Sequence, residues 1–392
     1  MQRGSTSYVV RFRGRPHLLG KIDRLSLEDA RELGRVKLLE LAREREQPSL
    51  AGRRKTLAEL AELHLQELAS GSDRAGTIAG YRLLWRVYLL PRVGGLRLGE
   101  VTPEVVMRLK RDLRTTPVSA NRALQQLSAA LSLAVRLKWV SDNPADRKVV
   151  EWYPERPRGR ALSADEYQRL GVALREAEAR SLLPSRTLAA IRLLLLTGAR
   201  PCEILGAEVS WLRLDGHPRI ELPEAKGDRP GRRRRGRSIW LSPAALAVIQ
   251  AISRPPGCRW LIPGDDPGCP LGSVRKAWGR ICRIVPGRCA TCAVQFWTSG
   301  SLVPPSACPS CGSAEISLEP PIVGASPMAA RHGYRSAAPR AGVVREHAAA
   351  LMGHQPGSRV TDEVYLSLEG REQSEAAGVL GEHLARLMGA GI

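Results

Sequence analysis

Apolar and polar residues alternate near the amino terminus in a pattern that predicts two strands followed by a helix. Residues 8–12 are rich in β-branched and aromatic side chains, Arg13-Gly14-Arg15-Pro16 breaks the run, and residues 18–22 resume it. Ser26 with Asp29 is typical of a helix N-terminus, and the helix is expected to run from about residue 27 to 45. We therefore expect residues 1–50 to form a small basic module.

The pattern then changes to a helical period over residues 55–145. Thr56 begins a capping box, and Thr102 followed by Pro103 is typical of a second helix start. Within residues 119–139 the leucines recur on one side of a 3.6-residue repeat, as expected of a helix that buries one face. These signals predict a helical domain.

A third domain is expected over residues 160–392, after a stretch rich in proline and charge at residues 143–159 that is typical of a linker. Ser163 caps its first helix. Short strands are predicted within residues 211–242, and a cysteine-bearing segment interrupts the helices at residues 286–321. The predicted fold class is mainly α with small β-sheets (α+β) in a multidomain chain.

The charge of the chain indicates its kind of partner. Among 392 residues there are 60 Lys plus Arg against 39 Asp plus Glu, a net charge of +21, which favours polyanions such as DNA. Base bias in the gene is the alternative explanation. We expect no membrane span and no secretory signal, hence reduced cysteines and a cytoplasmic protein.

Basic side chains follow the helices of the second domain and fill one loop of the third. The loop at residues 226–237 alone carries a net charge of +6. Such residues suit a phosphate-facing surface, although solvated helix faces have the same pattern. The predicted DNA-binding residues are Arg82, Arg86, Asn121, Arg122, Arg233 and Arg234.

One arginine stands in a turn between two apolar helices, Thr197-Gly198-Ala199-Arg200-Pro201. The proline suits a first helical turn, so Arg200 is expected beside a helix N-terminus, where free backbone amides favour a phosphate. Taken alone, the arginine is more simply a surface residue or an ion-pair partner of Glu203.

Arg200 is the first of six residues that follow one another in a characteristic order along the chain. They are an arginine after a glycine turn, a lysine in a β-hairpin, a His-x-x-Arg pair on one helix, a histidine after a glycine, and a tyrosine eleven residues later. In this order the chain resembles the tyrosine recombinase (phage integrase) family over most of its length. The candidate catalytic residues are Arg200, Lys226, His332, Arg335, His354 and Tyr365.

The resemblance implies an organisation and an activity. Residues 1–50 resemble an arm-binding module, residues 55–145 a core-binding (SAM-like) domain, and residues 160–392 the catalytic domain. It implies site-specific cleavage and rejoining of double-stranded DNA by a homotetramer on paired sites, for integration or excision of a mobile element or prophage. An accessory directionality factor is a further partner of this family, and the resemblance also implies a bacterial, nucleoid-associated protein.

The resemblance also implies a role for each candidate. Tyr365 attacks the scissile phosphate to form a 3′-phosphotyrosyl link, and Arg200 and Arg335 hold the nonbridging oxygens. His332 accepts a proton and Lys226 protonates the leaving 5′ oxygen. No cofactor is needed for catalysis, because the covalent link conserves the bond energy for religation.

The stretch that leads to His354, the expected hydrogen-bond donor to the phosphate, departs from the family pattern. Nineteen positions separate Arg335 from His354, about one helical turn fewer than usual, and Pro339 predicts a shortened or kinked helix. In the basic loop, one of the arginines of residues 229–237 is an alternative to Lys226.

Two Cys-x-x-Cys pairs, fifteen residues apart, lie in the segment 286–321. This spacing is typical of a structural zinc ribbon with four thiolate ligands and no open coordination position. The predicted zinc ligands are Cys289, Cys292, Cys308 and Cys311. Such an insertion is not part of the family pattern.

Two other functions remain open at this point. A type IB topoisomerase-like enzyme uses much the same catalytic set but relaxes DNA without exchanging partners. A noncatalytic, zinc-containing DNA-binding protein would keep the basic domains and the ribbon alone.

Overall fold

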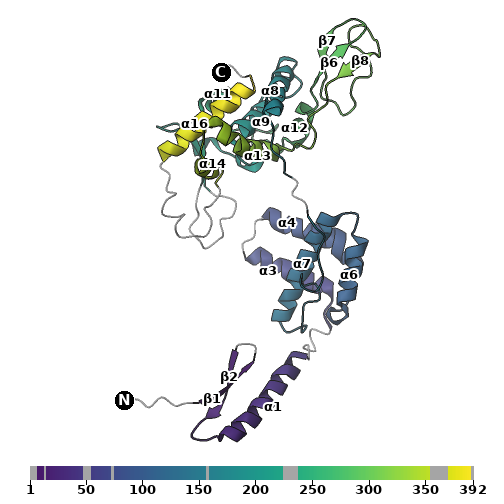
Figure 1. The fold of residues 1–392 in the computed structure, drawn as a ribbon, viewed down its shortest axis with the longest axis vertical. Coiled ribbons are helices and arrows are strands. Elements are labelled where there is room, and N and C mark those ends of the chain that lie inside the picture. Colours follow the sequence, from purple (N-terminus) through teal and green to yellow (C-terminus); the bar gives the residue numbers. More distant parts are fainter. Residues whose placement is uncertain are drawn as a thin grey trace. The chain divides into compact units, whose positions relative to one another are not determined.

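A computed structural model describes residues 7–12, 15–46, 54–71, 75–155, 159–223, 237–353 and 370–389. The chain divides into two compact units, Met1–Pro157 and Arg158–Ile392, each considered by itself below. It is mostly helical with small antiparallel sheets, so the predicted fold class is confirmed (Figure 1). Several predicted site residues lie outside the described residues: Lys226, Arg233, Arg234, His354 and Tyr365.

The strand-strand-helix pattern near the amino terminus is confirmed. Strands β1 (Ser7–Phe12) and β2 (Arg15–Lys21) pair antiparallel, and helix α1 (Leu27–Glu46) follows. A two-stranded hairpin is marginally stable in water, so a packed helix is needed. Helix α1 supplies it, since Gly34 of α1 lies beside Leu19 of β2, with an ideal Cβ position 3.5 Å from Leu19 Cδ1.

The rest of the first unit is a helical bundle. Its starts follow the sequence signals: Thr56 and Glu59 form the capping box, and the Thr102 side chain accepts from the backbone of Val105. Trp85 and Leu127 are fully buried in its core. The helices are α3 (Leu57–Ser70), α4 (Ala75–Leu84), the π-helical turn η1 (Trp85–Leu89), α5 (Leu90–Val93), the 3₁₀ turn η2 (Leu98–Glu100), α6 (Pro103–Asp112) and α7 (Pro117–Arg136).

The second unit is built around one buried helix, α9 (Ser185–Thr197), which contacts α13, α11 and α16. Its leucines from Leu193 to Leu195 are fully buried, so the end of α9 is a fixed point from which the next turn starts. The surrounding helices are α8 (Ala164–Ala179), α10 (Pro201–Leu205), α11 (Pro243–Gln250), α12 (Arg275–Ile281), α13 (Pro327–Ala337), α14 (Arg345–Leu351) and α16 (Gly370–Leu387), with 3₁₀ turns η3 (Val209–Trp211) and η4 (Ala338–Ala341).

A three-stranded antiparallel sheet lies in the second unit, in the order β3 (Leu212–Arg213), β4 (Arg219–Leu222) and β5 (Arg237–Trp240). Ile220 and Ile239 alternate with outward side chains and enter the core. Because Leu222 pairs with Arg237, β4 and β5 bracket the basic segment that holds Lys226 in the sequence.

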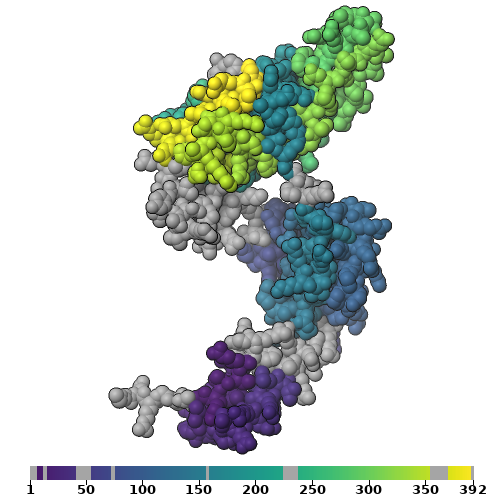
Figure 2. Space-filling view, viewed as in Figure 1, coloured from purple at the N-terminus to yellow at the C-terminus, as the bar shows by residue number. Residues whose placement is uncertain are grey.

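The cysteine-bearing segment folds as a second small sheet in the order β7 (Gln295–Trp297), β6 (Pro286–Cys289) and β8 (Ile316–Leu318). In Figure 2 it forms a green lobe at one end of the second unit. Arginines of the body hold it by donating to its backbone: Arg180 Nη1 to Trp297 O at 2.9 Å, and Arg280 Nε to Ser299 O at 3.0 Å. The lobe is therefore braced against the helices.

Candidate functional site

Arg200 is held by Glu203, the third residue of helix α10, whose N-cap is Arg200 itself. The αL glycine Gly198, with φ +60°, ends α9 and turns the chain so that Arg200 becomes the N-cap of α10. Glu203 accepts the Arg200 backbone N–H at 2.8 Å and its Nη1 at 2.7 Å. The ion pair is thus present, yet the Arg200 side chain remains 22% exposed. Its guanidinium therefore still reaches solvent.

Two further arginines gather around the same turn. Arg237 Nη1 donates to Glu203 Oε1 at 3.4 Å and to Met352 O at 2.8 Å. Arg331 Nη1 donates to Gly198 O at 2.9 Å, and its Nη2 donates to the same Met352 carbonyl. We call Arg200, Arg237, Arg331 and Glu203 the arginine cluster.

Burial makes the positive charge of this cluster costly. Burial, followed by the nearby charges of Arg237 and Arg200, lowers the pKa of Arg331 to about 10. Burial also lowers the pKa of Arg237, and the Glu203 carboxylate opposes that shift. Within the part of the chain described, Glu203 accepts from Arg200 and Arg237, while Arg331 donates to backbone carbonyls. Three guanidiniums thus have one carboxylate among them, an excess of positive charge that favours an anion.

His332 and Arg335 are not joined to this cluster by any hydrogen bond or ion pair found among the described residues. Both side chains are exposed, and both line a hollow of about 520 Å³ beside Gly159. The Gly159 backbone lies against the imidazole, because a Cβ there would be 2.7 Å from His332 Nε2. The arginine of α13 that belongs to the cluster is therefore Arg331, which shares the Met352 carbonyl with Arg237.

The sequence interpretation missed Arg331, although one signal pointed to it. Arg331 precedes Arg335 by four residues, about one helical turn. That is the length by which the stretch from Arg335 to His354 is short of the family pattern. The expected shortening near Pro339 is also found, since α13 ends at Ala337 and the proline lies in the 3₁₀ turn η4.

Gly353, which directly precedes His354 in the sequence, belongs to the surroundings of the cluster. It has φ +60°, and a Cβ there would lie 2.5 Å from Arg237 Cδ. The turn that leads to His354 is therefore packed on Arg237.

Tyr334 is unsuited to act as a nucleophile. It is 1% exposed, and burial raises the pKa of its hydroxyl above the ordinary value. Its ring packs on the turn before Arg200, since a Cβ on Gly198 would lie 2.5 Å from Tyr334 Cγ. Its function in the fold is to shape that turn.

The predicted DNA-binding residues of the helical bundle fall into two groups. Arg82, Arg86 and Arg122 are exposed. Asn121 is 2% exposed: its Nδ2 donates to Tyr153 O at 2.8 Å, and its Oδ1 accepts from Tyr153 N at 2.9 Å. This corrects the expectation for Asn121, whose amide links α7 to the segment after the bundle rather than facing DNA.

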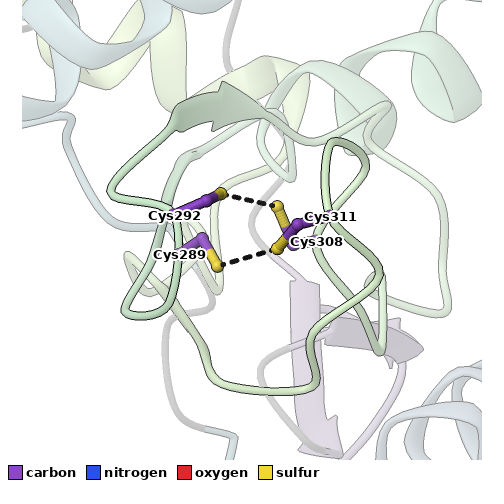
Figure 3. A group of neighbouring side chains, drawn as sticks. All are labelled: Cys289, Cys292, Cys308 and Cys311. Carbon is purple, nitrogen blue, oxygen red and sulfur yellow. Dashed lines mark hydrogen bonds between the residues drawn. The ribbon is translucent and has the colours of Figure 1, made fainter.

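The four cysteines of the inserted sheet converge (Figure 3). Their sulfur atoms all lie within 4.8 Å of one another, with Cys289 and Cys311 at 3.6 Å and Cys292 and Cys308 at 3.7 Å. A tetrahedral zinc with Zn–S bonds of about 2.3 Å requires sulfur separations of about 3.8 Å, so the arrangement fits that ion. The backbone N–H of Cys292 lowers the pKa of the Cys289 thiol to about 6, whereas hydrogen bonds with the neighbouring cysteines raise the pKa of the Cys311 thiol.

Comparison with known proteins shows the fold. Neither a family model nor a curated protein sequence matches the chain. Among solved structures, a lambda integrase tetramer bound to a Holliday junction is 17% identical, with a TM-score of 0.56, over 90% of this chain and 94% of that one. A lambda integrase dimer bound to a COC′ core site is 18% identical, with a TM-score of 0.55, over 93% of each chain.

A third similar structure is that of the Tn1549 transposon integrase with circular intermediate DNA. It is 16% identical, with a TM-score of 0.55, over 82% of this chain and 98% of that one. These integrases are tyrosine recombinases, so the chain has the tyrosine recombinase fold, with a four-cysteine cluster in addition. Among the described helices, none has the length and apolarity needed to cross a membrane.

Proposed function

We propose that this protein, which has the fold of the integrases, cleaves and rejoins double-stranded DNA at specific sites through a covalent tyrosine intermediate. The observation that carries the proposal is the arginine cluster: Arg200 and Arg237 share the Glu203 carboxylate at a helix N-terminus, and Arg331 donates to the Gly198 carbonyl in the turn before Arg200. A phosphodiester that gains charge during displacement needs such donors. The DNA-bound state of the similar integrases supports the same conclusion.

In this proposal Arg200 and Arg331 hold the nonbridging oxygens of the scissile phosphate. Arg331 replaces Arg335 in that role because it shares the Gly198 turn with Arg200, while Arg335 lines the exposed hollow beside Gly159. His332 lines the same hollow and stays proposed as the proton acceptor, which requires it to turn toward the phosphate.

The reaction that we propose exchanges one phosphate ester for another. The Tyr365 oxygen forms a bond to phosphorus, the bond from phosphorus to the 5′ oxygen breaks, and Lys226 supplies a proton to that oxygen. His354 donates a hydrogen bond to the phosphate. Because the tyrosyl ester keeps the bond energy, a second strand end reverses the steps and no cofactor takes part.

The wider assembly belongs to the same proposal. Four copies act on two paired DNA sites during integration or excision of a mobile element, with Arg82, Arg86 and Arg122 on the DNA-facing side of the bundle. A zinc ion bound by the four cysteines stabilises the inserted sheet, which has little core of its own. A topoisomerase-like enzyme is the second candidate, because it would use the same cluster.

A suicide substrate tests the proposal. Duplexes from the DNA that flanks the gene, each nicked beside a candidate cleavage point, should trap a covalent protein–DNA adduct. The adduct should disappear in Tyr365→Phe and persist in the control Tyr81→Phe, a half-buried tyrosine of the bundle. An adduct that survives Tyr365→Phe contradicts the assignment. Relaxation of supercoiled plasmid that lacks the site favours the topoisomerase.

A further inference from the structure

One member of the arginine cluster, Arg237, has no role in the reaction proposed above. It is the first residue of β5, and its side chain is 7% exposed, against 22% for Arg200. Its hydrogen bonds go to Glu203 and to the Met352 carbonyl. It therefore connects a strand, the helix that Arg200 caps and the turn after α14.

Through Glu203, Arg237 acts on the charge balance of Arg200. The Glu203 Oε1 atom accepts from Arg200 Nη1 at 2.7 Å and from Arg237 Nη1 at 3.4 Å. Without Arg237 the carboxylate would pair with Arg200 alone, and a one-to-one ion pair leaves a guanidinium less free to meet a phosphate. Sharing the carboxylate keeps the cluster electropositive.

Packing fixes the other end of Arg237. The Gly353 backbone lies against its side chain, since a Cβ there would be 2.5 Å from Cδ and 3.0 Å from Nε. Arg331 donates to the same Met352 carbonyl from α13. The turn at Met352 and Gly353 is thus held from two elements at once.

Burial disfavours the charged side chain of Arg237 in this position. Burial lowers its pKa, and among the described residues its Nε and Nη2 atoms are buried without an acceptor. Unpaired buried donors destabilise a fold, so these two atoms offset part of what the Arg237 hydrogen bonds contribute to stability. A contribution to stability alone does not account for an arginine here.

We propose that Arg237 is a positioning residue, which shares Glu203 with Arg200 and fixes the Met352–Gly353 turn so that the Arg200 guanidinium faces the scissile phosphate. This inference rests on the proposed function. It predicts that loss of Arg237 impairs the same chemical task as loss of Arg200, without impairing DNA binding or folding.

Single-turnover cleavage of two matched suicide substrates tests the inference. One has an ordinary scissile phosphodiester. In the other a methyl group replaces one nonbridging oxygen, so the linkage is uncharged and depends less on guanidinium neutralisation. The variants are Arg237→Met, Arg237→Lys and Arg200→Ala, with Arg213→Met as the control, because Arg213 is exposed in the same sheet and pairs with Glu221.

On the phosphodiester, we expect Arg237→Met to cleave about tenfold more slowly or worse, with Arg237→Lys recovering part of the rate. On the uncharged linkage the loss should shrink, as it should for Arg200→Ala. DNA affinity and melting temperature should stay close to those of the wild type, and Arg213→Met should behave as wild type.

Three results overturn the inference: an Arg237→Met rate within about twofold of wild type, an equal loss on both substrates, or a variant that no longer folds. The first leaves Arg237 without a role, the second shows that it does not act through phosphate charge, and the third makes it a structural residue. A wild-type chain that forms no adduct with either substrate refutes the proposed function itself, and is thus distinguishable.

Discussion

Arg331 and Arg237 donate to one acceptor, the carbonyl oxygen of Met352, from helix α13 and strand β5. The two side chains come from positions 94 residues apart in the sequence. Their shared acceptor lies just before the Gly353-His354 pair that the sequence analysis singled out. Because Arg331 also bonds to the turn before Arg200, this relationship connects the elements that flank most of the candidate catalytic residues.

The turn before Arg200 should tolerate no side chain at Gly198. Gly198→Ala combines a positive φ with a Cβ 2.5 Å from Tyr334 Cγ, so we expect it to lower the free energy of unfolding by about 2–4 kcal/mol. The matched control is Gly216→Ala, which has φ +68° and no neighbour within 4 Å and should cost about 1 kcal/mol. Urea denaturation of the variants measures both, and equal losses would contradict the packing argument.

The inserted sheet should need a bound metal ion to stay folded. Metal analysis of the purified protein should find one zinc per chain, and Cys308→Ser should release it, because three ligands no longer close the tetrahedron. Cys258→Ser is the control, since this thiol lies outside the four-cysteine cluster. Proteolysis should then cut the insertion of Cys308→Ser selectively. A metal-free protein whose insertion resists protease would refute the metal centre.

Two residues of the helical bundle should have different functions, one in stability and the other in DNA binding, which a binding assay alone would not distinguish. Asn121→Ala should destabilise the bundle by about 1–3 kcal/mol, because it leaves the partly buried Tyr153 backbone groups without their Asn121 partner. Arg82→Ala should leave stability unchanged, weaken DNA binding and reduce its dependence on salt by about one phosphate contact. Thermal melts together with salt titrations of DNA affinity check both. A stable Asn121→Ala that binds DNA weakly would restore Asn121 as a contact residue.

Local signals in the sequence predicted the elements well, because caps and turns act over a few residues. Thr56, Thr102 and Ser163 start helices as expected, and the cysteine pairs meet as their spacing required. The failures came from tertiary packing. Asn121 was expected at a surface, and its burial depends on Tyr153, 32 residues away.

Arg331 is a second residue whose position depends on tertiary packing and was not predicted from local sequence signals. A His-x-x-Arg pattern at His332 and Arg335 has the right residue types, whereas the position of α13 against α9 determines which arginine faces Gly198. The signal that distinguished Arg331 was the distance to His354 along the chain. Arg237 had no signal beyond its place at the end of a basic loop.

The central claim of this account is that Arg331, with Arg200, holds the phosphate that is cut. The most direct measurement is covalent adduct formation on one suicide substrate by Arg331→Ala and Arg335→Ala, compared at equal DNA occupancy. We expect Arg331→Ala to lower the cleavage rate by at least about a hundredfold and Arg335→Ala by less than about tenfold. An Arg331→Ala enzyme that cleaves as fast as wild type, beside an inactive Arg335→Ala, would contradict the account.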